Sequence, residues 1–250
     1  MRPPDVAILP FTQCPHAMIH SLPQPHDLPP LTMVGAGKLG QAVAGAWKDA
    51  GGQIGRAISY GQPWTPEGMV FEATAPEAAL PHLLRCLEHQ VPVVTGTTGW
   101  LSHLPQVQQA AEDHNGTLFW STNFSPAVHA THMIAREATR IMALLDGYEA
   151  SIQDVHHVHK KDAPSGTALT LQEHVRQAGW TKNLPIESER VGEVVGLHKL
   201  SWESDHDCVA LQHEAKSRLG FAQGAVMALR WTWARHQGNL PGVYTMTDLF

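Results

Sequence analysis

The sequence predicts an α/β fold in which a doubly wound parallel sheet is joined to a smaller α+β unit. Between residues 31 and 125, short apolar runs typical of strands alternate with segments of helical period. Beyond residue 125, longer strand-like runs follow one another with fewer helices between them. A chain of 250 residues, 43% of them hydrophobic, is long enough for two modest domains.

The first thirty residues show no helical or alternating period. Prolines interrupt them throughout, at Pro3, Pro4, Pro10, Pro15, Pro23, Pro25, Pro29 and Pro30. Two of these break the only apolar stretch that could serve as a signal peptide. We therefore expect residues 1–30 to be a flexible extension that can be deleted up to about residue 28. A start codon assigned too early remains an equal alternative.

Five strands and three helices account for the first unit. The expected strands are residues 31–34, 53–60, 69–74, 91–95 and 117–120. The helices follow the first, third and fourth of them, beginning near Leu39 and spanning residues 76–90 and 101–114. In a parallel sheet of this kind, ligands bind beyond the carboxyl ends of the strands.

A glycine fingerprint follows the first strand. Gly35, Gly37 and Gly40 form the pattern G-x-G-x-x-G between a strand and a helix, which is the context of a Rossmann-type dinucleotide-binding domain. Gly35 permits a tight turn, Gly37 lets the backbone approach a pyrophosphate, and Gly40 lets the helix pack closely. The alternative is a glycine-rich turn in a fold that binds no nucleotide.

The end of the second strand lacks the acidic residue that usually binds the ribose hydroxyls of NAD. Residues 53–60 end in Ser59 and Tyr60, and no Asp or Glu occurs before Glu67. Without a carboxylate to repel a 2′-phosphate, we expect NADPH or NADH as the cofactor. The candidate cofactor-binding residues are Gly35, Ala36, Gly37, Lys38, Leu39, Gly40, Gly96, Thr97, Thr98, Ser121, Thr122, Asn123 and Phe124.

The second unit is expected over residues 127–217. Residues 127–145 have a helical pattern, residues 148–159 suit a strand, a helix begins at Thr167, and residues 187–202 and 208–214 suit two further strands. A last helix over residues 221–236 returns the chain to the first unit through a turn at residues 218–221. The dinucleotide-binding domain thus comprises residues 31–126 and is completed by residues 218–250.

The run from His156 to Thr167 reads HHVHKKDAPSGT and indicates an anion-binding catalytic site. It combines histidines and lysines with a turn that opens into a helix, whose start offers free N–H groups to a carboxylate. A metal site on His157 and His159 is a weaker alternative, because adjacent lysines repel a cation. A solvated strand end with Ser165 as an ordinary helix cap is another.

These motifs together resemble the 4-hydroxy-tetrahydrodipicolinate reductase family. The resemblance spans roughly residues 31–250 and rests on five motifs in order: the glycine loop, Pro76-Glu77, Gly96-Thr97-Thr98-Gly99-Trp100, Asn123-Phe124-Ser125 and the HHVHKKDAPSGT run. It implies NAD(P)H-dependent reduction of a small dicarboxylate in lysine and diaminopimelate biosynthesis.

The resemblance also implies roles for individual residues. His156 would be the general acid or base and Lys160 its cationic partner and second proton donor, while His157, Ser165, Gly166 and Thr167 would hold the substrate carboxylates. The second domain would form a homotetramer. Pro126 and Ala127 depart from the glycine that often follows Asn-Phe-Ser in the family, which bears on the hinge between the domains.

Composition argues against some partners and compartments. The net charge of −6 argues against a nucleic-acid partner, and no apolar run is long enough to span a membrane. Three cysteines without framework spacing favour reduced thiols in the cytoplasm. Two other functions stay open: a related oxidoreductase acting on another small anionic imine or semialdehyde, and a non-catalytic nucleotide sensor, against which the presence of His156 and Lys160 argues.

Overall fold

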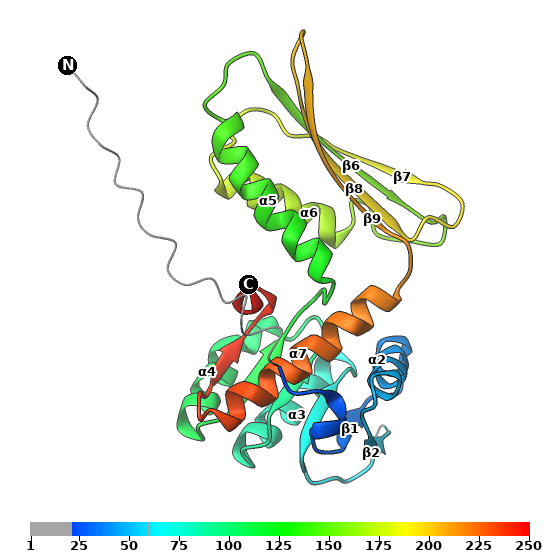
Figure 1. Cartoon of the computed structure of the whole chain (residues 1–250), viewed down its shortest axis with the longest axis vertical. Coiled ribbons are helices and arrows are strands. Elements are labelled where there is room, and N and C mark those ends of the chain that lie inside the picture. The colour runs from blue at the N-terminus through cyan, green and yellow to red at the C-terminus, as the bar shows by residue number, and fades with distance from the viewer. Residues whose placement is uncertain (1–21, 60) are drawn as a thin grey trace, which may run out of the picture.

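The computed structural model describes residues 22–59 and 61–250, which form two units joined by two crossings of the chain (Figure 1). The first unit contains a six-stranded sheet in which every neighbouring pair is parallel. Its strands lie in the order β10-β5-β4-β3-β1-β2. They are β1 Leu31–Val34, β2 Ile54–Ile58, β3 Met69–Glu72, β4 Val93–Thr95, β5 Thr117–Trp120 and β10 Gly242–Tyr244.

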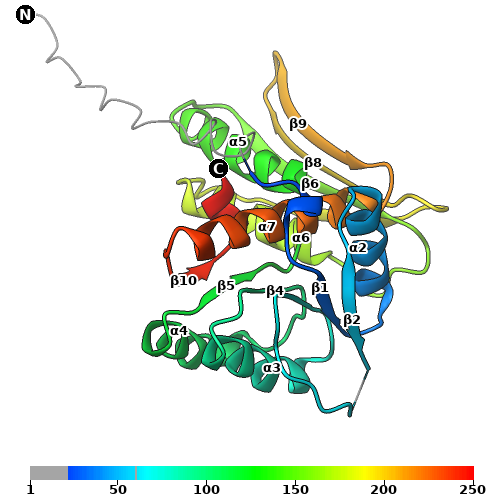
Figure 2. The ribbon, with the colours of Figure 1, turned by 60° about the horizontal axis from the view of Figure 1, so that its bottom comes forward.

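Helices cover both faces of this sheet, so the predicted doubly wound α/β fold is confirmed (Figure 2). On one face lie α2 Lys38–Asp49 and α7 Leu219–Gln237, and on the other α3 Pro76–Glu88 and α4 Leu104–Asp113. Alternating strand residues divide between the two cores, because successive side chains of a strand point to opposite faces. Met69 and Phe71 join the α2 and α7 side, whereas Val70 joins the α3 and α4 side.

The second unit is a four-stranded mixed sheet with two helices, as the predicted α+β domain requires. Its strands lie in the order β7-β6-β8-β9, with β6 parallel to β7 and antiparallel to β8. The helices α5 and α6 pack together along one face of the sheet (Figure 1). The elements are α5 Pro126–Met142, β6 Glu149–His156, α6 Gly166–Gln177, β7 Ile186–Arg190, β8 Gly196–Glu203 and β9 Cys208–Ala215.

The two crossings between the units meet at one close contact. The chain leaves the first unit through Phe124 and returns along α7, whose Gly224 faces that exit. A Cβ atom at Gly224 would lie 1.7 Å from the carbonyl oxygen of Phe124 and 2.9 Å from Cδ of Pro126. Pro126 occupies the first turn of α5, where the missing N–H of proline is tolerated.

Four local expectations differ from the structure. The strand expected over residues 187–202 is two strands separated by a turn at Gly192, whose φ is +47°. The strand that contains His156 ends there and does not continue to residue 159. The turn expected at residues 218–221 is already helical from Leu219, and β10 was not anticipated.

The N-terminal segment also differs from expectation where the structure describes it. Leu22 and Leu28 are buried in the core beneath α7, and Arg230 donates hydrogen bonds to the carbonyl oxygens of Leu22 at 2.9 Å and Pro23 at 2.7 Å. Residues 22–30 therefore pack against the first unit, because their leucines and prolines supply apolar surface without a regular period. Residues 1–21 lie outside the described part of the chain.

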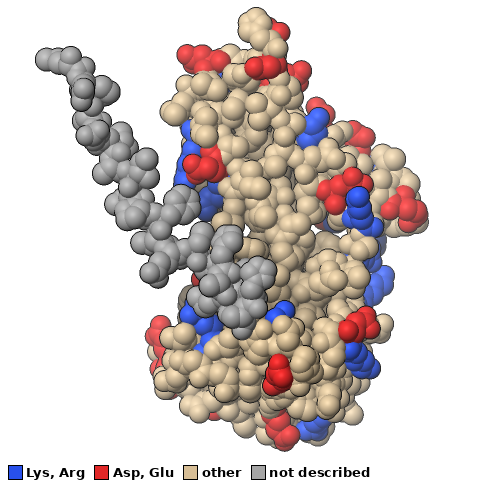
Figure 3. All heavy atoms as spheres, viewed as in Figure 1, with Lys and Arg blue, Asp and Glu red and all other residues tan. Residues whose placement is uncertain are grey.

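The surface carries interspersed charges. On the face shown in Figure 3, acidic and basic side chains lie scattered among neutral ones without a large area of one sign. Within the described ranges, no helix combines the length and apolarity that crossing a bilayer requires.

Packing of residues 22–30 predicts that Leu28→Ala lowers the free energy of unfolding by about 2–4 kcal/mol, because the substitution leaves a cavity in the core. Urea denaturation of the purified chain measures this value. Leu240→Ala is the matched control, since Leu240 is 45% exposed. Equal stability of the two variants would show that this segment does not contribute to the fold.

Candidate functional site

The glycine loop between β1 and α2 adopts the geometry that its sequence predicts. Gly35 has a φ of +103°, a conformation that side chains disfavour, and a Cβ there would lie 2.1 Å from the carbonyl oxygen of Ala73. A Cβ at Gly40 would lie 2.6 Å from the carbonyl oxygen of Gly35. Both positions need glycine because a Cβ atom there would collide with a backbone carbonyl oxygen.

The start of α2 is open to an anion. Gly37 is the residue before the helix and provides no side-chain cap, and a Cβ at Gly37 would contact nothing within 4 Å. The N–H groups of Lys38, Leu39 and Gly40 find no acceptor within the described part of the chain. Free donors at the positive end of a helix dipole fit a pyrophosphate.

Two further predicted cofactor loops, after β4 and β5, lie at the same edge of the sheet. A Cβ at Gly96, after β4, would meet Leu39 at 2.6 Å and Phe124 at 3.1 Å, so these residues converge. The Thr97 hydroxyl accepts a hydrogen bond from the N–H of Thr74 at 2.8 Å, which ties the loop after β4 to the loop after β3. Ala36, Thr98 and Thr122 lie in the same loops.

The buried carboxylate of Glu72 holds the loops after β3 and β4 through hydrogen bonds. Glu72, at the end of β3, has no exposed surface and accepts hydrogen bonds from Thr95 at 2.5 Å and from Thr74. Burial alone raises the pKa of Glu72, but the His82 imidazole, 3.6 Å away, and hydrogen bonds from the threonines outweigh it and hold that pKa below its ordinary value. Glu72 was not among the predicted site residues.

The loop after β5 connects the two units. Ser121 Oγ donates to the carbonyl oxygen of Asn123 at 2.6 Å, and His129 Nε2 lies 2.7 Å from the same oxygen. The Asn123 side-chain amide then reaches Thr167 of the second unit, with Nδ2 3.4 Å from Oγ1. One predicted cofactor residue and one predicted substrate residue thus contact each other at this pair.

The start of α6 is the second open helix terminus. Ser165 is its N-cap, accepting a hydrogen bond from Ala168 N at 3.2 Å, and is only 2% exposed. Its hydroxyl is therefore engaged in capping, which was the alternative interpretation of this serine. The N–H groups of Gly166 and Thr167 have no acceptor among the described residues, so they remain free for a carboxylate.

The loop between β6 and α6 positions Lys160. Its ammonium lies 2.7 and 2.8 Å from the two oxygens of Asp162 and is partly exposed. The hydrogen bond from Lys160 holds the pKa of Asp162 below its ordinary value. Arg190, at the end of β7, donates a hydrogen bond to the carbonyl oxygen of Asp162. Asp162 thereby connects this loop to two cations, Lys160 and Arg190.

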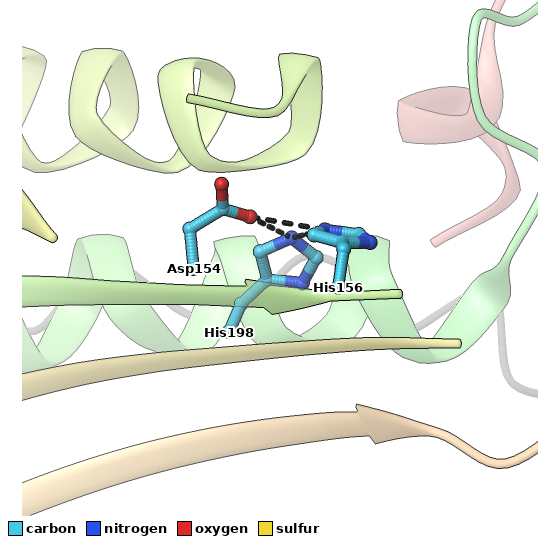
Figure 4. Close-up of side chains that lie close together, drawn as sticks. All are labelled: Asp154, His156 and His198. Carbon is cyan, nitrogen blue, oxygen red and sulfur yellow. Dashed lines mark hydrogen bonds and ion pairs between the residues drawn. The ribbon is translucent and has the colours of Figure 1, made fainter. Parts of the chain in front are cut away.

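His156 lies in a buried cluster with Asp154 and His198 (Figure 4). Its Nε2 lies 2.9 Å from Asp154 Oδ1 and 3.3 Å from His198 Nε2, and its Nδ1 lies 3.1 Å from the carbonyl oxygen of Val195. His198 Nε2 lies 3.4 Å from the same Asp154 oxygen and 3.1 Å from Ser165 Oγ. Both imidazoles are directed at one carboxylate oxygen.

Strand periodicity explains why these three residues meet. Ala150, Ile152, Asp154 and His156 occupy the buried face of β6, which changes from apolar to polar along its length. The antiparallel neighbour β8 changes at the same end, because His198 pairs in register with Asp154. His156 was predicted from the sequence, whereas Asp154 and His198 were not. The i, i+2 spacing of Asp154 and His156 was the available signal.

The structure separates His157 and His159 from this cluster. The strand ends at His156 and a turn follows, in which Lys160 N donates to the carbonyl oxygen of His157. The two rings are 6.1 Å apart at the margin of the unit, and His159 is exposed. The strand expected over residues 148–159 therefore does not include these two histidines.

Further histidines line the space between the helices and the sheet. His132 of α5 lies beside His174 of α6, with ring centroids 5.0 Å apart, and His198 stacks on His213 of β9. Burial and neighbouring histidines lower the pKa of His132 to about 3 and that of His198 to about 4. Burial also lowers the pKa values of His129, His174 and His213.

Models of one protein family match most of the chain. Residues 65–124 match the model described as dihydrodipicolinate reductase, N-terminus, and residues 127–250 match the model described as dihydrodipicolinate reductase, C-terminus. The glycine loop precedes the matched region.

Individual relatives of the chain belong to the same family. A 4-hydroxy-tetrahydrodipicolinate reductase of Thiobacillus denitrificans is 33% identical over 86% of this chain and 85% of its own length, and one of Bdellovibrio bacteriovorus is 31% identical over 87% and 93%. Among solved structures, a dipicolinate-bound dihydrodipicolinate reductase from Paenisporosarcina sp. TG-14 has a TM-score of 0.72 at 18% identity, covering 87% of this chain and 97% of that one.

The buried histidines predict a loss of stability in acid. Because the folded-state pKa values of His132 and His198 lie below the ordinary value of 6.5, protonation favours the unfolded chain. The stability that comes from keeping these two histidines uncharged is complete above pH 6.5. It is lost as the pH falls below 6.5, toward the folded-state pKa of about 4 for His198 and about 3 for His132. At about pH 5.5, each of these two histidines lowers the free energy of unfolding by about 1.4 kcal/mol relative to its value well above pH 6.5.

Urea denaturation between about pH 5.5 and 7.5 measures this slope. His132→Leu, which cannot be protonated, should make the slope shallower, whereas His103→Gln on the surface should leave it unchanged. A stability that does not depend on pH in this window would contradict the burial of uncharged histidines.

Proposed function

The chain belongs to the 4-hydroxy-tetrahydrodipicolinate reductase family, and on that premise we propose that the open helix starts of its two units bind the cofactor and the substrate. The protein is an NAD(P)H-dependent oxidoreductase that reduces 4-hydroxy-tetrahydrodipicolinate to tetrahydrodipicolinate in lysine and diaminopimelate biosynthesis. The observation that supports the placement is the contact between Asn123 and Thr167, because it brings the loop after β5 to the start of α6.

The residues at the start of α2 fit a dinucleotide. The free N–H groups of Lys38, Leu39 and Gly40 would hold the pyrophosphate, and the space beside Gly37 admits it. The loops at Gly96–Thr98 and Ser121–Phe124 would line the nicotinamide, which supplies the hydride. Both NADH and NADPH are proposed, since β2 and the exposed Ser59 that follows it place no carboxylate against a 2′-phosphate. Tyr60 lies outside the described residues.

The start of α6 fits the dicarboxylate substrate. Gly166 and Thr167 would donate their N–H groups to one carboxylate, and Lys160 would pair with a carboxylate after exchanging its contact with Asp162. His157, in the same loop as Lys160, adds a half-buried imidazole. Ser165 supports this arrangement as the cap of α6 and has no exposed hydroxyl to offer.

The reaction needs one hydride and one proton. Hydride addition to a conjugated imine leaves electron density on the substrate, which a positioned acid must quench. We assign this proton to His156, with Lys160 as the cation that stabilises the negative charge and as a second donor. A coupled assay with freshly prepared dehydratase product, followed in parallel with NADH and NADPH, tests the reaction and the cofactor together. Absence of oxidation of either cofactor would refute the proposed function.

Three wider assignments belong to the same proposal. The domains comprise residues 31–126 with 218–250, and residues 127–217. Exposed apolar side chains on α5 and just after it, Met133, Ile134, Ile141 and Leu144, support a homotetramer formed through the second unit. A role in amino-acid biosynthesis and a set of free cysteines support a cytoplasmic location.

The first prediction concerns Lys160. Lys160→Ala should lower kcat/KM roughly 100-fold or more, because it removes a cation and proton donor from the substrate. Affinity for NADPH should stay at the wild-type value, since Lys160 belongs to the unit that does not carry the glycine loop. Lys161→Ala, one residue along and exposed, is the matched control. Near wild-type turnover of Lys160→Ala would remove Lys160 from the mechanism.

The second prediction concerns Gly37. Gly37→Val should weaken NADPH binding roughly tenfold or more, because two methyl groups would occupy the space reserved for the pyrophosphate. The melting temperature should change little, as a Cβ at this position has no atom of the protein within 4 Å. Calorimetry on Gly37→Val beside Gly45→Val, an exposed glycine of the same helix, provides the comparison. Equal affinities would mean that the loop is only a structural turn.

A further inference from the structure

Three buried side chains of β6 and β8 direct one oxygen and two nitrogens at the same point (Figure 4). Asp154 Oδ1 lies 2.9 Å from His156 Nε2 and 3.4 Å from His198 Nε2, and the two nitrogens lie 3.3 Å apart. Without an ion, both imidazoles can be neutral, because His198 Nε2–H can donate to His156 Nε2. That hydrogen bond leaves the buried Oδ1 of Asp154 without a donor in the described part of the chain.

The spacing of these three atoms fits a metal ion. Atoms separated in this way can all lie about 2.0–2.1 Å from one ion, which is the length of zinc bonds to imidazole and carboxylate. In a tetrahedral zinc site, neighbouring ligand atoms are about 3.3–3.4 Å apart. Two of the three observed distances have that value. Among the described residues, no other set of three His, Cys, Asp or Glu side chains converges in this way.

The groups behind these side chains orient them as metal ligands are oriented. His156 Nδ1 lies 3.1 Å from the carbonyl oxygen of Val195, so it donates there and leaves Nε2 facing the cluster. Asp154 Oδ2 accepts hydrogen bonds from Ser165 N at 2.9 Å and Ser188 Oγ at 3.2 Å. One carboxylate oxygen is thus fixed by the fold, and the other is free for an ion.

The surroundings favour zinc over iron. An iron(II) site built from two histidines and one carboxylate keeps several positions open to other ligands. Here the three side chains are at most 8% exposed, and Ser165 Oγ lies 3.1 Å from His198 Nε2. A closed site with a further oxygen beside it suits zinc, which binds four ligands and needs no open position.

Neighbouring groups limit the strength of such a site. The charge of Lys160 is balanced by Asp162, whose oxygens lie 2.7 and 2.8 Å away, but Arg190 lies 3.6 Å from Asp154 Oδ2 and competes for that carboxylate. His198 must also hold its hydrogen on Nδ1 when Nε2 binds an ion, and this Nδ1 is buried without a partner among the described residues. Both features lower the affinity, so an ion bound here exchanges with the solution.

We propose that Asp154, His156 and His198 form an exchangeable zinc site, and that zinc bound there inhibits the reductase reversibly. The inhibition rests on the proposed function, because zinc on His156 Nε2 occupies the lone pair that must carry the proton for the substrate. The site itself depends on no reaction. Zinc binding and reduction therefore exclude each other at this imidazole.

Calorimetric titration of the metal-free, full-length chain with zinc sulfate tests the site without substrate or cofactor. Variants separate it from weak binding elsewhere, since the chain has 17 histidines. His198→Gln should weaken the strongest site about 100-fold or more, because losing a direct ligand costs more than losing an outer partner. His159→Gln, which removes an exposed imidazole outside the cluster, should leave the strongest site unchanged.

X-ray absorption of the zinc-loaded wild type identifies the ligands and does not depend on whether a variant folds. Two imidazoles and oxygen at about 2.0–2.1 Å are expected. A sulfur ligand at about 2.3 Å would place the zinc at a cysteine and overturn the inference. A wild type that binds no zinc would overturn it too, as would equal zinc affinity in the wild type and in folded His198→Gln, or loss of the strongest site in His159→Gln.

Activity provides the second arm. Wild type that has been incubated with one equivalent of zinc and desalted should oxidise NADPH roughly tenfold more slowly or worse in the coupled assay, because a proton donor is blocked. EDTA should restore the rate. His198→Gln, treated in the same way, should keep its own zinc-free rate. Full activity of the zinc-loaded wild type would overturn the inhibition.

The two arms separate this inference from the proposed function. Titration and X-ray absorption require no substrate, so the expected zinc site in a chain that oxidises neither NADH nor NADPH would support the site and refute the reaction. Reduction by a chain that binds no zinc would leave the proposed function intact and refute the site.

Discussion

The contact between Gly224 and the carbonyl oxygen of Phe124 sets the relation between the two units. Chain leaving the first unit and chain returning to it pass each other here with no room for a side chain. The loop after β5 ends at this contact, and Asn123, one residue earlier, reaches across to Thr167. The distance between the cofactor loops and the start of α6 therefore depends on a position where only glycine fits.

Both ligand sites use the same physical device. The protein has a net charge of −6, yet a reductase of this family must bind two anionic molecules at once. In the proposed arrangement, the free N–H groups at the starts of α2 and α6 would bind them, with Lys160 and Arg190 beside the second. Backbone donors at a helix terminus attract an anion without an excess of basic side chains on the surface.

Buried carboxylates fix the loops around both sites. Glu72 ties together the loops after β3 and β4, and Asp154 ties the end of β6 to the start of α6. Each is fully buried; hydrogen bonds reach both oxygens of Glu72 and one oxygen of Asp154, whose other oxygen faces two imidazoles. The cost of burying these charges is offset by donors whose positions the strands determine.

The sequence predicted those features whose signal lies in residues close together along the chain. The glycine loop, the alternating strands and helices, and the run from His156 to Thr167 all carry short-range signals. The partnership of Asp154 with His198 depends on strand pairing across 44 residues, which no local period reveals. The packing of Leu22 and Leu28 depends likewise on α7, about two hundred residues away, and prolines concealed it.

The addition of α7 and β10 to the first sheet has a consequence for synthesis on the ribosome. The second unit is continuous in sequence and can fold as soon as β9 has emerged. The first sheet must wait, because Phe71 and Phe119 stay uncovered on one face until α7 arrives. A nascent chain thus carries a finished later domain beside an incomplete earlier one, and its exposed apolar face is the surface that chaperones would bind.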